Sequence, residues 1–279
     1  MFCFTRWWRQ PKLLGDEPLK RLGNLFMPVA VAGCCVLAGG ALQASEILRD
    51  GSYWDWQLTE PFDLSVDVKV IDLDADSVSR AQISALKARG VKTICYVSVG
   101  TVENYRDDAG QFPESVMGVV YDDWPNERYL DIRQRDVLVP LMQARFDRCK
   151  ALGFDAIEPD NMDLFENDTG LDISMQDQAN YMAELVAYAH RIGLEIGQKN
   201  APELIPYMHD RFDFIIFESC FYYDFCDDAE PYISAGKDVL ATEYPHKRVN
   251  ENEACAYGAK TGVKFIFKER ELAAGGRAC

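Results

Sequence analysis

The sequence predicts an α/β fold, a single (β/α)8 TIM-like barrel, on three observations. Short apolar runs of four to eight residues recur along the chain, segments of helical periodicity separate them, and glycines end several of those segments. The length of the runs and their content of Val, Ile, Phe and Tyr are typical of strands buried on both faces. The eight runs are Trp54–Leu58, Val68–Leu73, Lys92–Val99, Phe154–Ile157, Leu194–Gly197, Phe212–Phe217, Asp238–Ala241 and Val263–Phe267.

Glycines mark the ends of three predicted helices. A glycine that follows a helix and directly precedes a strand is the usual exit from a helix in a repeated strand–helix fold. The predicted helices are Ser77–Arg89, Gln134–Leu152 and Ser174–Ile192, and the glycines that follow them are Gly90, Gly153 and Gly193. A doubly wound open sheet is the weaker alternative, because no glycine-rich phosphate-binding turn follows an early strand.

Two connections depart from an ideal barrel. Only Thr59 to Asp67 separates the first two strands, which is too short for a full helix, and only 12 residues follow Phe267. We therefore expect the first and last helices of the barrel to be short or missing. No internal repeat and no linker rich in Pro, Gly or Ser divides the chain, so residues 45–279 are predicted to form one domain.

The first 44 residues have the pattern of an export segment. Five basic residues precede an apolar stretch, residues 25–42, and small residues follow it. Val31-Ala32-Gly33-Cys34 resembles a bacterial lipobox, which would leave Cys34 lipidated, whereas the small residues at 39–44 suit ordinary cleavage. An uncleaved membrane anchor is a third alternative, because eighteen residues can just span a bilayer. The expected location is extracellular, periplasmic or membrane-anchored as a lipoprotein.

The chain is strongly acidic, with a formal net charge of -16. Residues 45–279 contain 24 basic and 43 acidic side chains, so they alone carry -19. This charge would repel phosphate backbones, which argues against nucleic acid as a partner, and it would attract a cationic ligand. Three scattered histidines are too few for a His-rich zinc site, and neither a metal nor a cofactor is expected.

Six cysteines follow the export segment: Cys95, Cys149, Cys220, Cys226, Cys255 and Cys279. An even number in an exported chain permits disulfides, but six cysteines allow 15 pairings and the sequence does not choose among them. The late cysteines could include one pair. Cys95 lies in a predicted strand, where a buried free thiol is an equal alternative.

The residues that carry chemistry follow the predicted strands. Active sites of (β/α)8 barrels lie at the C-terminal ends of the strands. Acids that meet there are costly to bury without partners, and their pKa values are pushed apart, which suits acid–base chemistry. The strand ends carry Asp72 and Asp74, Tyr96, the segment Glu158–Asp163, Lys199 and Asn200, Glu218, and Glu243.

Asp160 and Glu218 are the predicted catalytic pair. They end the fourth and sixth strands, from which they can face each other across the mouth of the barrel. Glycoside cleavage needs two carboxyl groups that flank the bond, one protonated and one ionised. A turn or a helix cap is the structural alternative for Asp160, because Pro-Asp-Asn is typical of turns. Lys199 is expected to form an ion pair with Asp160 and hold it ionised.

Asp72 and Asp74 allow a different interpretation, as oxygen ligands of Mg²⁺ or Ca²⁺ in a metal-dependent hydrolase. No calcium-binding loop spacing accompanies them, and a solvated loop is a further alternative.

Aromatic residues near the acids could stack on the apolar faces of sugar rings, with core packing as the alternative for each. Trp124 is the strongest candidate, because Asp122-Asp123-Trp124-Pro125-Asn126 has the composition of a loop. The predicted substrate-binding residues are Trp56, Asp72, Asp74, Tyr96, Trp124, Asp163, Lys199, Asn200, Tyr222 and Glu243.

The sequence resembles glycoside hydrolase family 114, the endo-α-1,4-polygalactosaminidase-like barrels, over about residues 53–245. The Glu-Pro-Asp-Asn motif is fairly specific, and the other segments are individually weak but occur in the right order. The matching segments are Trp54–Leu58, Ile94–Gly100, Glu103–Arg106, Tyr129–Arg133, Gly153–Asp163, Lys199–Asn200, Glu218, Cys220–Phe221 and Cys226.

The resemblance implies hydrolysis of α-1,4-linked, galactosamine-containing polysaccharide, with Asp160 as the nucleophile and Glu218 as the general acid/base. Deacetylated galactosamine polymers are cationic, which agrees with the acidity of the chain. Phe217 and Ala201 replace residues that are polar in the family, which leaves the preferred sugar open. The alternative function is a catalytically silent, cell-surface carbohydrate-binding protein on the same barrel. Loss of turnover with retained binding in Asp160→Asn would favour the enzyme.

Overall fold

The computed structural model describes residues 53–122 and 124–279, and the predicted export segment, residues 1–44, lies outside them. Within the described residues, no helix has both the length and the apolar character needed to cross a membrane.

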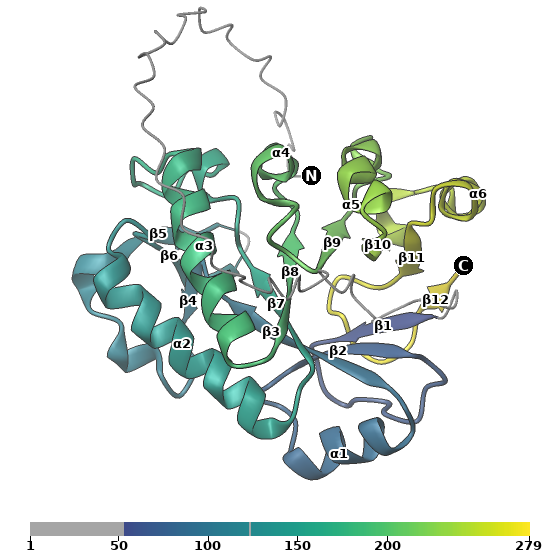
Figure 1. The fold of residues 1–279 in the computed structure, drawn as a ribbon, viewed down its shortest axis with the longest axis horizontal. Helices are drawn as coiled ribbons and strands as arrows, with labels where there is room; N and C mark the ends of the chain where they lie inside the picture. The colour runs from purple at the N-terminus through teal and green to yellow at the C-terminus, as the bar shows by residue number, and fades with distance from the viewer. Residues whose placement is uncertain (1–52, 123) are drawn as a thin grey trace, which may run out of the picture. The chain divides into compact units, whose positions relative to one another are not determined.

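Eight parallel strands form the barrel (Figure 1). In their order around the sheet they are β1 (Trp54–Gln57), β2 (Val70–Asp74), β3 (Lys92–Ser98), β7 (Ala156–Asp160), β8 (Glu195–Lys199), β9 (Phe214–Glu218), β10 (Val239–Glu243) and β11 (Lys264–Phe267). Each of the eight predicted apolar runs overlaps one of these strands, and several strands extend past the end of the predicted run. The predicted fold class is confirmed.

The barrel closes without a backbone ladder between its first and last parallel strands in the part of the chain described here. The indole nitrogen of Trp54 in β1 donates to the carbonyl of Lys264 in β11 at 2.9 Å. The amides of Leu58 and Thr59 donate to the carbonyl of Leu272. Beyond β11, the short strand β12 (Arg277–Ala278) pairs antiparallel with it.

The helices connect the strands and, in Figure 1, α1, α2 and α3 lie along the outside of the sheet. They are α1 (Arg80–Ala88), α2 (Arg135–Leu152), α3 (Met175–Arg191), α4 (Ile205–Met208), α5 (Glu230–Ser234) and α6 (Glu251–Thr261). No helix connects β1 to β2 and none follows β11 within the described residues, as predicted. Ser79 and Ser174 begin α1 and α3 with capping boxes, in which serine and the residue three positions later satisfy each other's backbone amides.

The chain forms a second, antiparallel sheet in the segment that follows β3 and precedes α2. It consists of β4 (Thr101–Glu103), β6 (Trp124–Leu130) and β5 (Met117–Tyr121), in that order. The sequence predicted a loop around Trp124, and this was wrong, because Trp124 begins β6. The alternation of charged and apolar residues in β6 is brief, and Pro125 made the segment unlike a strand. Pro is nevertheless tolerated at the start of a strand.

Side chains alternate along each strand, so every second residue points into the barrel (the inner set) and the residues between them point outward (the outer set). The inner set forms a cluster inside the barrel, which includes Trp54, Val70, Ile94, Ala156, Phe214, Ile216, Leu240 and Ile266. The outer set packs under the helices. Gly197 belongs to the inner set because a Cβ atom there would lie 2.4 Å from the Phe214 ring. The floor of the barrel is therefore mainly apolar, and acidic inner residues such as Asp72, Glu158 and Asp160 lie from the middle of their strands to the C-terminal ends.

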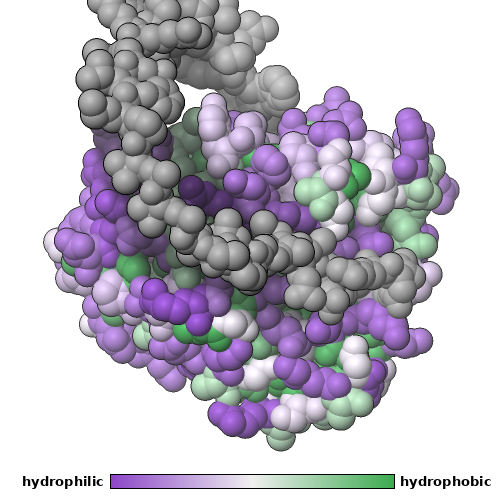
Figure 2. All heavy atoms as spheres, in the orientation of Figure 1, coloured by the Kyte–Doolittle hydropathy of each residue, from purple (hydrophilic) through white to green (hydrophobic). Residues whose placement is uncertain are grey.

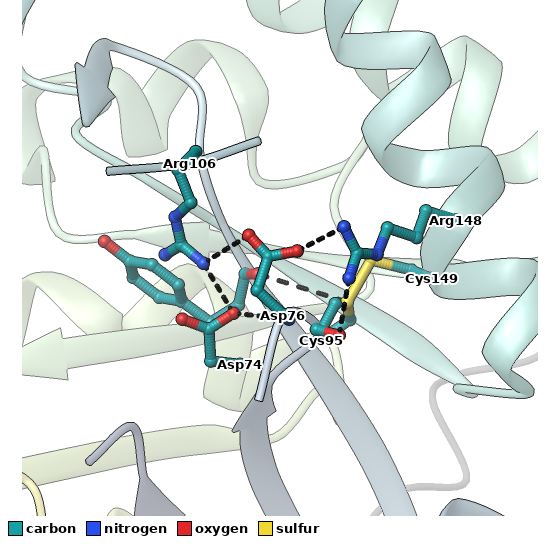
Figure 3. The surroundings of a disulfide bond; sticks show 8 residues. Asp74, Asp76, Cys95, Arg106, Arg148 and Cys149 are labelled. Carbon is teal, nitrogen blue, oxygen red and sulfur yellow. Dashed lines mark hydrogen bonds and ion pairs between the residues drawn. A yellow bond between two sulfur atoms is a disulfide. The ribbon is translucent and has the colours of Figure 1, made fainter. Parts of the chain in front are cut away.

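Three disulfides link the described residues: Cys95–Cys149, Cys220–Cys226 and Cys255–Cys279. The free-thiol alternative for Cys95 was wrong, because Cys95 in β3 is bonded to Cys149 in α2. Figure 3 shows this bond beside Asp76, whose carboxylate lies between the guanidinium groups of Arg106 and Arg148.

The surface is mainly polar on the face drawn in Figure 2. Hydrophilic residues predominate on the described part of this face, with apolar residues scattered among them. This agrees with the 27% of charged residues in the sequence.

Candidate active site

Lys199 lies at the centre of the site. Its Nζ atom is 2.8 Å from Oε1 of Glu158, 2.8 Å from Oδ1 of Asp160 and 3.6 Å from Oε2 of Glu218. Burial opposes the charge of this ammonium, but the charges of the three carboxyl groups outweigh burial and raise the pKa of Lys199 well above its usual range. One fixed cation therefore joins the last inner positions of three neighbouring strands, β7, β8 and β9.

Asp160 is held from three sides. Oδ1 contacts Lys199, and Oδ2 accepts a hydrogen bond from the Tyr96 hydroxyl at 3.2 Å. The side-chain amide of Asn161 donates to the hydroxyl oxygen of Ser98 at 2.9 Å and to Oδ2 of Asp160 at 3.4 Å. Burial, followed by the charge of Asp160, raises the pKa of Tyr96 well above its usual range, so Tyr96 is a fixed donor. The carboxylate is thus oriented by residues of β3, β7 and β8.

Glu218 ends β9 and is half-buried. Its Oε1 accepts a hydrogen bond from the Tyr244 hydroxyl at 2.5 Å. Its backbone amide donates to Oδ1 of Asn200 at 2.8 Å, which fixes the end of β9 to the end of β8. Burial and the charge of Glu218 raise the pKa of Tyr244 well above its usual range. Because a third of its side chain is exposed, at 34%, Glu218 can reach a ligand above the barrel.

The backbone is strained directly after each of these residues. Asn161, Asn200, Ala201 and Ser219 have φ values of 61°, 43°, 50° and 62°, in the left-handed region that residues with a Cβ atom rarely adopt. Such strain gathers at functional sites. Gly100 permits the close turn at the end of β3, because a Cβ atom there would lie 1.9 Å from the carbonyl oxygen of Asn161.

Asp72 and Glu243 were predicted to contact substrate, and the structure contradicts this, because neither has exposed surface. Asp72 is buried beside Glu158, whose charge adds to burial in raising the pKa of Asp72 well above its usual range. The oxygens of Glu243 accept from the backbone amides of Phe221 and Tyr222 at 2.7 and 3.3 Å. Glu243 belongs to the outer set of β10, and the next residue, Tyr244, points into the barrel instead.

Trp56 and Asp74 also lie elsewhere than predicted. Trp56 is 1% exposed, and its ring supports Lys199, whose Nζ lies 4.5 Å from the ring centroid. Asp74 is bound to Arg106 at 2.7 Å. Burial of Trp56 and the ion pair of Asp74 leave both side chains little surface for a sugar.

The remaining predicted residues lie around the mouth. Asp163 follows β7, and burial together with the charge of Asp160 raises its pKa to about 6. Tyr222 is 48% exposed on the loop closed by Cys220–Cys226. Trp124 is 46% exposed, with the guanidinium of Arg270 5.2 Å from its ring centroid. Tyr222 and Trp124 therefore present aromatic surface.

Sequence reasoning assigned no role to three groups near the site. Glu158 precedes Asp160 by two positions, so the two-residue period of a strand could have placed it on the same face. Tyr244 could have been found from the same period in β10. Glu127 comes from the unpredicted sheet, where its Oε2 accepts from Thr101 at 2.7 Å. Burial, with Glu103 and Asp160 nearby, raises the pKa of Glu127 to about 7.

The described residues offer no convincing ligand set for a metal. The single cluster of suitable geometry is Cys220, Cys226 and Glu243, whose two cysteines are joined in a disulfide. Asp72 is buried against Glu158, and Asp74 is bound to Arg106, so these two acids do not converge on an open position. A cavity of about 160 Å³ lies beside β3, but ion-paired residues such as Arg106, Arg145 and Arg148 line it, and neither Asp160 nor Glu218 does.

The fold and the site define a TIM-barrel glycoside hydrolase, with two carboxyl groups at the ends of strands two positions apart. A family model described as glycoside-hydrolase family GH114 matches residues 39–279. The chain belongs to this family.

Solved structures show the same fold. Ega3 from Aspergillus fumigatus, in complex with galactosamine, is 30% identical with a TM-score of 0.80, and the match covers 86% of this chain and 100% of that one. The glycoside hydrolase domain of PelA from Pseudomonas aeruginosa is 15% identical with a TM-score of 0.63, covering 81% and 97%. No curated protein sequence matched the chain.

Proposed function

We propose that this protein is an exported, retaining glycoside hydrolase that cleaves α-1,4-linked, galactosamine-containing polysaccharide. Asp160 is the nucleophile and Glu218 the general acid/base. The observation that carries the proposal is that one ammonium, Lys199 Nζ, lies 2.8 Å from an oxygen of Asp160 and 3.6 Å from an oxygen of Glu218.

The two distances are compatible with a retaining mechanism. They bring these two oxygens closer than the roughly 6.5–9.5 Å that separates the carboxyl groups of inverting enzymes. Asp160 attacks the anomeric carbon while protonated Glu218 donates its proton to the leaving oxygen. A covalent glycosyl–Asp160 ester results. Glu218, now ionised, then removes a proton from water, which attacks the same carbon and releases Asp160.

The surrounding residues support these roles. Lys199, Tyr96 and Asn161 all donate to or contact the Asp160 carboxylate, so it is oriented before substrate arrives. Glu218 has fewer donors, with Tyr244 on one oxygen and Lys199 at the longer distance, and it has more exposed surface. A strongly bonded carboxylate suits a nucleophile, and a more accessible carboxyl suits proton exchange with water.

Galactosamine is supported as the sugar by the 30% identical relative, whose structure contains it. The acidity of the chain supports a cationic polymer, because a mouth lined by carboxyl groups would attract and orient it. Export is supported by the basic and apolar pattern of residues 1–44 and by three disulfides, which form in oxidising compartments.

The test is the release of reducing ends from partly deacetylated α-1,4-galactosamine polymer. Wild type, Asp160→Asn and Glu218→Gln are compared with Asp155→Asn. Asp155 is a matched control because it directly precedes the N-terminal end of β7, opposite to the end that carries Asp160, and pairs with Lys87. We expect both site variants to lose about 10³-fold or more in kcat/KM, and the control to stay near wild type.

Two outcomes would contradict the proposal. If Asp160→Asn released reducing ends as fast as wild type, Asp160 would not be the nucleophile. Binding of the polymer without release by wild type would indicate a carbohydrate-binding protein. Proton NMR of the first product decides the stereochemistry, since retention requires the α-anomer to appear before mutarotation.

A further inference from the structure

Two carboxyl groups are buried together below the proposed nucleophile. Asp72 in β2 and Glu158 in β7 have no exposed surface. In the part of the chain described here, no donor reaches either oxygen of Asp72 or Oε2 of Glu158. The two carboxyl groups are close enough for the charge of Glu158 to raise the pKa of Asp72. Oε1 of Glu158 accepts from Lys199 at 2.8 Å. Two ionised carboxylates offer acceptors alone, so a hydrogen bond between these groups requires one of them to carry a proton.

The charges around the pair do not supply a second cation. The groups that face it are Lys199 from β8, Asp160 from its own strand β7 and, beyond Lys199, Glu218 from β9. Tyr96 from β3 and Tyr244 after β10 also face this group, and both are neutral donors to the catalytic pair. Four carboxyl groups thus surround one ammonium in a site without water contact at its base.

We propose that Asp72 and Glu158 share one proton and act as a single negative charge that positions Lys199 against Asp160. Asp72 carries the proton and donates it to Oε2 of Glu158, and Glu158 holds the ammonium through Oε1. They are positioning residues, because neither can touch substrate. This inference rests on the proposed role of Asp160.

Burial agrees with the assignment. It raises the pKa of Asp72 well above the usual range, and the neighbouring charge of Glu158 raises it further. The pKa of Glu158 is also raised by burial, although Lys199 opposes this. Two interacting carboxyl groups titrate as a pair, and the second proton is lost only at high pH.

The shared charge has a function in the geometry. Lys199 contacts Glu158 and Asp160 at the same distance, so its attraction is divided between them. If both buried carboxyl groups were ionised, the Lys199 ammonium would be drawn away from Asp160. If both were neutral, the ammonium would interact with Asp160 and Glu218 alone. A single negative charge holds the ammonium in place and reduces its electrostatic attraction to Asp160.

Amide substitutions test the sharing, because asparagine and glutamine keep the shape and can replace the hydrogen bond. Asp72→Asn leaves Glu158 ionised with an N–H donor beside it. Glu158→Gln lets Asp72 ionise and accept from the new amide. Each single variant therefore keeps one negative charge, and the double variant keeps none.

The readout is the acid limb of the pH profile of kcat/KM. We expect each single variant to keep this limb within a few tenths of a pH unit of wild type. We expect the double variant to move it about one pH unit or more toward lower pH, because Lys199 then acts on Asp160 without competition from below. Asp155→Asn controls for the loss of a carboxylate elsewhere on the same barrel. If the two single variants each shift the limb by half of the double variant's shift, the carboxyl groups carry separate charges and the proposal is wrong.

A second measurement needs no turnover. The infrared carbonyl band of a neutral carboxyl should persist at pH 9 in wild type, where Glu127, Glu243 and Asp163, with pKa values of about 7, 7 and 6, are ionised. The band should vanish in both single variants. Its absence from wild type would overturn the shared proton, whether or not the polymer is a substrate, so failure here is distinguishable from failure of the proposed function.

Discussion

The hydroxyl of Tyr244 lies 2.5 Å from Oε1 of Glu218, and it comes from the strand next to the one that carries Glu218. A hydrogen bond at this distance fixes one oxygen of the carboxyl before substrate arrives. Tyr244 therefore helps to orient Glu218 for proton transfer to the leaving oxygen.

Tyr244→Phe should lower kcat/KM about tenfold, because Oε1 of Glu218 loses the donor that orients it. The measurement is the rate of polymer cleavage. Tyr181→Phe is the matched control, since it also removes a buried hydroxyl, which donates to the Val99 carbonyl at 3.0 Å away from the catalytic pair. An equal kcat/KM in Tyr244→Phe and wild type would show that this contact does not position Glu218.

Lys199→Met should destabilise the fold and abolish most activity. Removing one partner of a buried ion pair leaves an uncompensated charge, at a cost of about 3–5 kcal/mol, and here the nucleophile also loses its cation. Lys268→Met breaks another buried pair, between Lys268 and Asp55 at 2.6 Å. We expect similar losses in urea stability from both, but a fall in kcat/KM of about a hundredfold or more, at temperatures where the variants are folded, only from Lys199→Met. Equal activity losses would assign Lys199 a purely structural role.

The enzyme should be more stable near pH 5 than near pH 8. Burial, as the largest cause, raises the pKa values of Glu127, Glu166 and Glu243 to about 7 and that of Asp163 to about 6. Between pH 4.5 and 7 the unfolded chain has lost these protons and the folded chain still binds them, so stability falls as pH rises. Calorimetric melting temperatures across this range measure the effect. Glu127→Gln should reduce the slope, and a melting temperature that rises from pH 5 to 8 would contradict the prediction.

The disulfides should differ in their contribution to stability. Cys95 and Cys149 are 54 residues apart, and Cys220 and Cys226 are six apart. On the chain-entropy account the long loop contributes about 4 kcal/mol and the short one about 2 kcal/mol. Urea unfolding of the two double Cys→Ala variants measures this order. The short-loop variant should instead raise KM, because that loop carries Tyr222, whose amide is bound by Glu243. A reversed order of stabilities would mean that strain or packing outweighs chain entropy.

Much of the barrel could be predicted because burial on both faces leaves an unbroken apolar run at each strand. Asp160, Lys199 and Glu218 followed from the rule that barrel sites lie at the C-terminal strand ends. The direction of a side chain was harder to predict. At the end of β10 an error of one position exchanged Glu243 for Tyr244, because the sequence does not show which residues of a doubly buried strand face inward.

The sequence also did not show how deeply each side chain is buried. Asp72 and Trp56 were predicted to contact substrate, but both are buried, and the Trp56 ring lies against Lys199. The sheet that contains Glu127 was missed because its strands are short and Pro125 opens one of them. Cysteine pairing depends on the approach of α2 to β3, which is a tertiary contact that no local pattern records.

The place where β1 meets β11 has a dynamic consequence. Side-chain and loop hydrogen bonds from Trp54, Leu58 and Thr59 close the barrel there, whereas every other pair of neighbouring parallel strands has a backbone ladder. Opening this junction requires few hydrogen bonds to break, so it is the low-energy route for local unfolding. Amide protons of β1 and β11 should therefore exchange with deuterium sooner than those of β3 and β7, which places Tyr96 and Asp160 on a wall of the barrel that opens less readily than this junction.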